Sequence, residues 1–202
     1  MVKLPCFRPG IARSSRVWRL FFVDNMTITE KHILFWSDWP SNFAWAPMKL
    51  KCLDGITRRF FSSEQYFMYE KAKHFNDTYT ANKILDLDFN DSYSFNAKKL
   101  GRQVKGFDEA EWNKVSYDIM LRACLAKFGQ NKVLFDKIMD PAIADKKFVE
   151  ASPYDCIWGI GYGEADPKAD DETMWKGENR LGKVLDEVRE KLKNGYTEEI
   201  IY

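Results

Sequence analysis

Apolar and polar positions predict a small β portion near the start of the chain. Residues 33–36 are continuously apolar and are followed by a turn at 37–40, which predicts a short strand. The runs 48–53 and 56–61 flank Asp54-Gly55. Because both residues tolerate positive φ, this dipeptide predicts a hairpin closed by a type I′ turn.

Helical spacing dominates the rest of the chain. Ser62 with Gln65, and Asp108 with Glu111, are capping-box pairs, so helices are expected to begin there. The second helix is the longest and is expected to run to about Phe128 and to be closed by Gly129. Further helices are expected within 80–87, 94–103, 133–139 and 179–192, and a further strand within 148–151. The pattern predicts a mainly α (α+β) fold, a multihelical single domain with a small β-hairpin and sheet portion.

The helix that begins at Ser62 has charged residues on its apolar side. At about 100° per residue, Glu64, Met68, Lys71 and Phe75 fall within one narrow arc. Seven residues of helix separate Glu64 from Lys71 by roughly 10 Å, too far for direct pairing. Each charge therefore needs a partner from another segment or a ligand. The alternative is that Glu64 is a first-turn carboxylate favoured by the helix dipole and that Lys71 extends to solvent.

A glycine-rich segment, 152–163, is the second feature with chemical potential. Gly159, Gly161 and Gly163 alternate next to Trp158, which suggests backbone brought close to a flat or phosphorylated group. The dinucleotide fingerprint is excluded because the strand–turn–helix spacing is missing.

Composition narrows the class of protein. A chain of 202 residues with 45% hydrophobic and 30% charged residues is typical of one soluble globular domain. The net charge of +1 gives no reason to expect a surface that wraps a long nucleic acid, although local contact with a nucleotide stays open. The 15% aromatic content, with seven Trp, suits core packing and stacking on planar ligands equally well.

Cysteine content, charge distribution and the length of apolar stretches add further expectations. Four widely spaced cysteines without a CxxC pair, and only two histidines, assemble no zinc pattern, so we expect no metal, no other cofactor and a cytoplasmic location. Residues 1–25 hold five basic side chains and one acid and are expected to be a basic extension to a domain at 26–202. No apolar stretch approaches the ~20 residues needed to span a bilayer.

Several separated segments together resemble the NADAR family, which includes the riboflavin-biosynthesis-intermediates N-glycosidase. They are Ser41-Asn42-Phe43, Ser63 to Phe67 with Lys71, Gly101-Arg102, Trp112 with Asp118 to Met120, Lys127-Phe128, Val149-Glu150 with Ser152, Asp155 with Trp158 to Gly161, and Gly177 with Asn179, Leu181 and Gly182. They occur in the same order as in the family over residues 32–192, which argues against a chance match.

The resemblance implies hydrolysis of the N-glycosidic bond between a ribose and a nitrogen heterocycle. Family substrates include phosphoribosylamino-pyrimidines of the riboflavin pathway and ADP-ribosylated guanine, so the implied partner is a small ribosylated molecule or an ADP-ribosylated nucleic acid. The catalytic residues expected on this basis are Glu64, Lys71 and Asp155. The substrate-binding residues expected are Asn42, Phe43, Arg102, Trp112, Trp158, Gly159 and Asn179.

The chemistry of the bond supports these roles. Breaking a ribosyl C–N bond passes through an oxocarbenium-like state, which needs a nearby anion, a positioned water and help for the departing base. Glu64 would stabilise the positive charge or activate water, and Asp155 would position the ribose or leaving group. Trp112 and Trp158 would stack on flat rings, while Arg102 and the glycine-rich segment would hold phosphate.

Structural roles stay open for three of these residues, and a second function stays open for the protein. Trp112 lies on an apolar helix stripe and suits a core, Asp155 suits a turn cap, and Arg102 suits a helix C-terminus. The alternative function is a non-catalytic module that binds ADP-ribose or a nucleotide. Glu64 favours catalysis, since a module that only binds gains nothing from a carboxylate beside the ribose.

Overall fold

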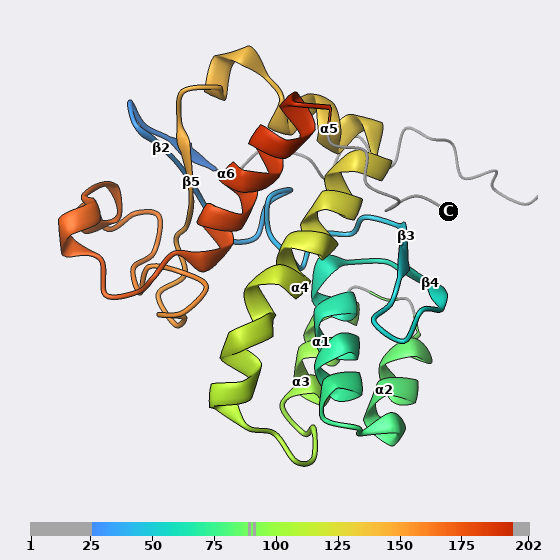
Figure 1. Ribbon diagram of the computed structural model, residues 1–202. Helices are drawn as coiled ribbons and strands as arrows, with labels where there is room; N and C mark the ends of the chain where they lie inside the picture. Colours follow the sequence, from blue (N-terminus) through green and yellow to red (C-terminus); the bar gives the residue numbers. More distant parts are fainter. Residues whose placement is uncertain (1–25, 89, 91, 196–202) are drawn as a thin grey trace, which may run out of the picture.

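The computed structural model describes residues 26–88, 90 and 92–195, and Figure 1 shows their arrangement. The predicted basic extension, residues 1–25, lies outside these described residues. Within the described part there are six α-helices, namely α1 (Ser63–His74), α2 (Thr78–Leu85), α3 (Tyr93–Gly101), α4 (Glu109–Gln130), α5 (Lys132–Ile138) and α6 (Arg180–Lys193). The strands are β1 (Thr27–Ile28), β2 (His32–Phe35), β3 (Met48–Lys51), β4 (Thr57–Phe60) and β5 (Lys147–Glu150), and the short 3-10 helices are η2 (Pro141–Ile143), η3 (Pro167–Asp170) and η4 (Glu172–Met174). The predicted α+β class with a small β portion is confirmed.

The main sheet joins segments that are far apart in the sequence. Its strand order is β1-β2-β5, with β1 antiparallel to β2 and β2 parallel to β5. All four residues of β2 are buried, which explains the apolar residues at 33–35, whereas Trp36 lies beyond the strand and is exposed. The β2–β5 register places Phe35 beside Glu150 at the carboxyl ends of both strands. Every α-helix except α6 lies in the connection between these two strands.

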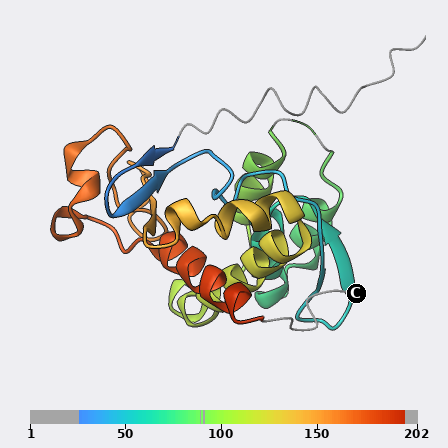
Figure 2. The ribbon, with the colours of Figure 1, turned by 90° about the horizontal axis from the view of Figure 1, so that it is seen from above.

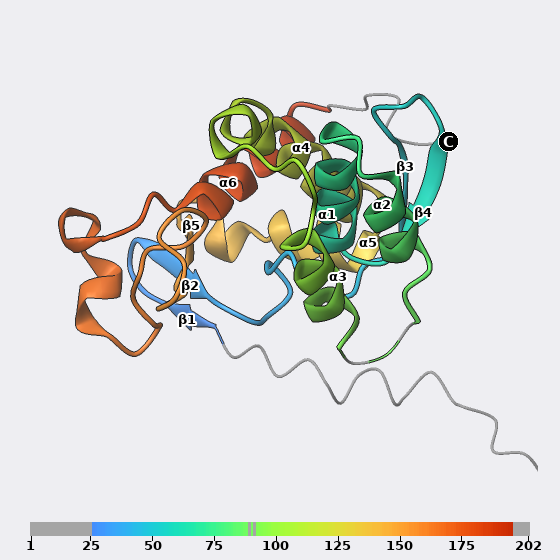
Figure 3. The ribbon, with the colours of Figure 1, turned by 90° about the horizontal axis from the view of Figure 1, so that it is seen from below.

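The longest helix, α4, lies between the other large elements. It contacts α1 on one side and α6 on the other, and α6 in turn covers β5 (Figures 1 and 3). Helix α1 also contacts α2 and α3. Because α4 has neighbours on two sides, it is apolar on two sides, and buried residues run along it from Trp112 to Phe128. No helix in the described ranges combines the length and apolar character that crossing a membrane would require.

The β3–β4 hairpin forms at the predicted place but with a different turn. The Gly55 N–H donates to the Cys52 carbonyl at 2.9 Å, and the Cys52 N–H donates to the Ile56 carbonyl at 3.0 Å, so three residues form the loop. Only Gly55 of the predicted pair has a positive φ, 82°. The predicted type I′ turn is therefore wrong, because Asp54 instead uses its carboxylate to accept the Ile56 N–H at 3.1 Å.

Both long helices begin at the predicted caps, but one ends later than expected. The Ser62 hydroxyl accepts the Gln65 N–H at 3.1 Å, and the Asp108 carboxylate accepts the Glu111 N–H at 2.9 Å. The predicted closure of α4 by Gly129 is wrong, since the helix continues through Gly129 to Gln130. Asn131 ends it by donating from Nδ2 to the Lys127 carbonyl at 2.8 Å, which satisfies an otherwise free helix-end carbonyl.

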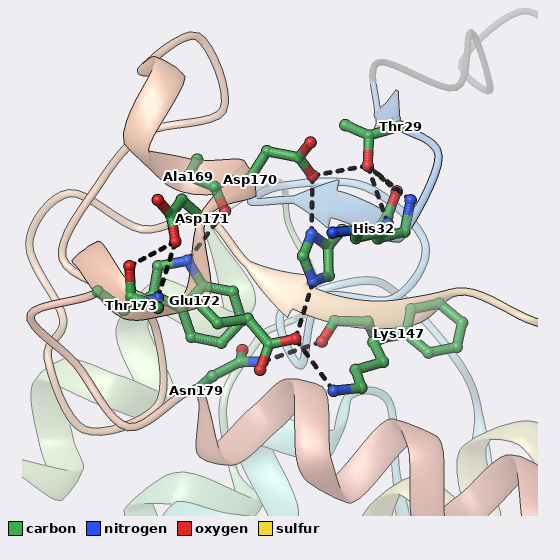
Figure 4. Close-up of polar contacts among 12 residues, drawn as sticks. Thr29, His32, Lys147, Ala169, Asp170, Asp171, Glu172, Thr173 and Asn179 are labelled. Carbon is green, nitrogen blue, oxygen red and sulfur yellow. Dashed lines mark hydrogen bonds and ion pairs between the residues drawn. The ribbon is translucent and has the colours of Figure 1, made fainter.

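An acidic segment, residues 164–174, contains η3 and η4. It lies at the end of the molecule away from α2 (Figure 2). Buried His32 attaches it to β2: Nδ1 lies 2.7 Å from Asp170 Oδ1 and Nε2 lies 3.2 Å from Glu172 Oε1 (Figure 4). Lys147 Nζ, on β5, also lies 3.0 Å from Glu172 Oε1. These contacts hold the acidic segment against the main sheet.

Candidate active site

A pocket with a volume of ≈ 200 Å³ lies where α1, α3 and α4 meet the segments that follow β2 and β5. It is lined by Asn42, Glu64, Phe67, Met68, Lys71, Lys98, Arg102, Phe107, Glu109, Trp112, Asn113, Ser116, Met120, Glu150, Asp155, Ile157 and Trp158. Charged groups of both signs and aromatic rings therefore surround one concave space, the usual character of a ligand site.

Seven of the ten residues expected at the site line this pocket: Asn42, Glu64, Lys71, Arg102, Trp112, Asp155 and Trp158. Phe43, Gly159 and Asn179 fall outside the set of described lining residues. The Phe43 ring lies 5.2 Å from the Nζ of Lys98, which does line the pocket. Asn179 accepts the Glu150 N–H at Oδ1 and donates from Nδ2 to the Phe148 carbonyl, both at 3.0 Å. It joins the start of α6 to β5.

Glu64 lies in the first turn of α1 and is buried, with only 2% of its surface exposed. Its Oε2 accepts a hydrogen bond from Asn42 Nδ2 at 2.5 Å, while Oε1 has no hydrogen-bond partner among the described residues. Burial raises the Glu64 pKa to about 7, and Asp155 adds to this rise while Lys98 opposes it. A carboxyl that titrates near neutral pH and has one free oxygen suits proton transfer or stabilisation of a cation.

The segment that carries Asn42 is held by a buried lysine of α4. Lys127 is fully buried, and its Nζ donates to the Trp39 and Ser41 carbonyls at 2.7 Å and to the Pro40 carbonyl at 3.3 Å. Asn42 follows directly, and its own carbonyl accepts the Glu64 N–H at 3.0 Å. Burial lowers the Lys127 pKa to about 8. Lys127 therefore fixes the backbone from which Asn42 reaches Glu64.

Asp155 begins the turn that carries Trp158. Its Oδ1 accepts the Ile157 N–H at 2.9 Å and the Trp158 N–H at 2.8 Å, so it caps this turn as well as lining the pocket. Gly159 allows the turn to lie close to β5, because a Cβ there would be 2.9 Å from the Glu150 carbonyl oxygen. The glycine thus brings backbone close to backbone, where we expected it to meet a ligand.

Aromatic rings form one wall of the pocket. Phe67 lies between Trp112 and Trp158, with ring centroids 5.0 Å and 5.2 Å away respectively. Trp112 is only 7% exposed and also packs in the main core. Its ring therefore belongs to the core and also lines the pocket, and its stacking on a substrate stays a prediction.

Lys71 and Glu64 face the same pocket from two turns of α1. Lys71 Nζ lies 3.9 Å from the centroid of the Phe107 ring, a cation–π contact. Burial lowers the Lys71 pKa, Arg102 lowers it further, and Glu64 acts in the opposite direction. The neutral amine is therefore easier to reach than for a lysine in water.

Three further charged residues line the pocket that were not among the residues expected from the sequence: Lys98, Glu109 and Glu150. Lys98 extends from α3 and lowers the pKa of both Glu64 and Glu150. Glu150 is the last residue of β5 and is 8% exposed. A signal for Glu150 was present, since it is the one charged residue of the predicted strand 148–151. In the described ranges, no three His, Cys, Asp or Glu side chains are grouped so that they could hold a metal ion.

Comparison with known proteins agrees with this site. The family model of the NADAR domain matches residues 21–193 of the sequence, so the chain belongs to this family. The family resemblance inferred from the sequence is confirmed.

Three relatives illustrate the extent of the similarity. Protein irg-1 of Caenorhabditis elegans is 39% identical over 81% of this chain and 77% of its own length. N-glycosidase R617 of Acanthamoeba polyphaga mimivirus is 37% identical over 72% of this chain and 84% of its own. N-glycosidase YbiA of Escherichia coli is 34% identical over 75% of this chain and 79% of its own. The NMR structure of E. coli YbiA superposes with a TM-score of 0.61 and 31% identity, covering 84% of this chain and 89% of that one. Several relatives are thus named N-glycosidases, in agreement with the hydrolase class predicted from the sequence.

Proposed function

We propose that this protein hydrolyses the bond between the ribose C1′ and the nitrogen of a ribosylated heterocycle that carries phosphate. The observation that carries the proposal is the Glu64 carboxyl, which is buried in the pocket with one oxygen bound by Asn42 and the other without a partner in the described part of the chain. A group placed in this way is costly for folding, so a role toward a ligand is the simplest reason for it.

Glu64 is placed to stabilise the positive charge that develops on the ribose. In its ionised form it stabilises the oxocarbenium-like state, and with a pKa near 7 it also accepts the proton of an attacking water. Asn42 holds Oε2, so Oε1 is the oxygen available for this work. In an alternative route, the neutral amine of Lys71 bonds to C1′ as the C–N bond breaks and its electron pair goes to the departing base. Ring opening then gives an imine with the ribose, and water hydrolyses this imine to release the sugar and restore Lys71.

The remaining lining residues suit the two ends of such a substrate. Trp112 and Trp158 flank Phe67 and offer ring surfaces to a planar heterocycle. Lys98 lies in the last turn of α3, and Arg102 directly follows that helix. Together they supply positive charge for a phosphate. Asp155 would position the ribose or the departing base.

A single chromatographic assay tests the proposal. Purified protein is given a phosphoribosylamino-pyrimidine in one reaction and an ADP-ribosylated guanine nucleotide in another, and release of the free base is followed. We expect the base to be released from one of the two substrates and Glu64→Gln to abolish most of this release. Binding of ADP-ribose without base release from either substrate would instead indicate a module that only binds nucleotides.

A further inference from the structure

Glu150 is a buried carboxyl in the pocket to which the mechanism so far gives no task. Its backbone is fixed on both sides: the N–H donates to Asn179 Oδ1 at 3.0 Å, and the carbonyl accepts the Ile160 N–H at 3.1 Å. The side chain lines the pocket together with Glu64 and Asp155. Glu109, the fourth carboxyl residue of the lining, is exposed, which leaves three carboxyl groups that are at least partly buried in one space of ≈ 200 Å³.

The surroundings of Glu150 favour a bound proton. Its Oε2 is buried and accepts no hydrogen bond within the described ranges. The titratable groups that face it are Glu64 from α1, Asp155 from the segment after β5, Cys124 from α4 and Lys98 from α3. Burial raises the Glu150 pKa to about 8, Asp155 and Glu64 add to this rise, and Lys98 alone opposes it. Near neutral pH the carboxyl is mostly the neutral acid, which is a proton donor.

Asp155 is less suited to that task, because one of its oxygens is committed to the turn. Oδ1 accepts the backbone N–H groups of Ile157 and Trp158, and these bonds hold Trp158 in place. Glu64 is needed in its ionised form. Of the three carboxyls, Glu150 is therefore the one whose proton is free to leave.

We propose that Glu150 is the general acid that protonates the departing nitrogen when the ribosyl C–N bond breaks. This proposal rests on the proposed function. An amine leaves poorly as an anion, so a proton must reach the nitrogen as the bond breaks. The bonding electron pair goes to the nitrogen, which takes the Glu150 proton, while a water oxygen bonds to C1′ and Glu64 accepts the proton that the water loses. Return of one proton from Glu64 to Glu150 restores both residues, and the net change is addition of water across the bond.

Comparison of two kinds of leaving group tests this role. One substrate is the phosphoribosylamino-pyrimidine or ADP-ribosylated guanine that the wild-type protein cleaves, and the other is p-nitrophenyl riboside, whose leaving group departs without a proton. Glu150→Gln should lower kcat on the first about 10²–10⁴-fold and on the second less than about tenfold. Glu64→Gln should be slow on both, because both reactions pass through the same ribosyl cation.

Two further variants separate chemistry from folding. Glu70 is also a buried glutamate of α1, but it is absent from the lining set, so Glu70→Gln should leave turnover of both substrates unchanged. Wild-type kcat on the amine-linked substrate should fall as the pH rises through about 8, where Glu150 loses its proton. Glu150→Asp, which keeps a carboxyl, should retain such a fall, and Glu150→Gln should lose it.

The outcomes are distinct. Wild-type rates for Glu150→Gln on the amine-linked substrate, or an equal loss on both substrates, would overturn the general-acid role while leaving the N-glycosidase function standing. A wild-type protein that cleaves neither substrate would overturn the proposed function itself, and this role with it. A Glu150→Gln variant that does not fold leaves the Glu150→Asp profile as the test, and absence of the alkaline fall in that variant counts against the proposal.

Discussion

Replacement of Glu64 by Gln should make the protein more stable and much less active, and both effects follow from the same buried position. The amide keeps the size of the carboxyl and still accepts the Asn42 hydrogen bond, but it removes the charge. Loss of a charge that stabilises the transition state typically lowers kcat about 10²–10³-fold. The stability effect has the opposite sign, because burial opposes the ionised form of Glu64.

The size of the stability effect follows from the pKa. A rise from the ordinary value of 4.5 to about 7 corresponds to about 3 kcal/mol. The folded protein holds this proton more tightly than the unfolded chain, so the free energy of unfolding falls as the pH rises from about 4.5 to about 7 and then levels off. The Glu64→Gln variant should not show this fall in the free energy of unfolding, because its amide does not ionise. Its advantage over the wild type should be small at pH 4.5 and approach about 3 kcal/mol at pH 8.

Urea denaturation at pH 4.5, 6 and 8, combined with single-substrate kinetics, measures both effects. Glu111→Gln is the matched control, since Glu111 lies in the first turn of α4 with an exposed side chain and does not line the pocket. It should change the free energy of unfolding by less than about 0.5 kcal/mol and leave kcat unchanged. A stability difference for Glu64→Gln that is the same at all three pH values would refute the buried-charge argument, and near-normal turnover would remove Glu64 from the mechanism.

Three other predictions concern the pocket and its surroundings. Trp112→Ala should lower stability by about 3–5 kcal/mol and raise KM, whereas Trp112→Phe should restore most of the stability but not the KM; an unchanged KM in both would assign the ring to the core alone. If Lys71 attacks C1′, borohydride added during turnover should leave a ribose adduct on Lys71 visible by mass spectrometry, and Lys71→Arg should be inactive. Unmodified protein together with an active Lys71→Arg would leave direct attack by water. A chain that starts at Met26 should fold and keep its kcat, because the lining residues all lie within 42–158; an insoluble product would show that the preceding residues belong to the domain.

Local features of the sequence were sufficient to locate the helices and part of the pocket. Ser62 and Asp108 mark helix starts because a capping side chain acts on backbone only three residues away. Glu64 and Lys71 fall on one face of α1 because the helix period alone fixes that relation. The hairpin turn at Asp54-Gly55 and the helix end at Gly129 were wrong in detail, since these residues permit more than one local geometry and side chains from nearby decide between them.

Only the tertiary structure decided which segments meet at the pocket. Parallel pairing of β2 with β5 joins strands more than a hundred residues apart and places Glu150 among the lining residues. Lys127 holds the carbonyls before Asn42 across 86 to 88 residues. Gly159 packs against β5, although its spacing had suggested a ligand. These relations depend on chain segments that pack together from distant parts of the sequence, and no local period or cap encodes such a meeting.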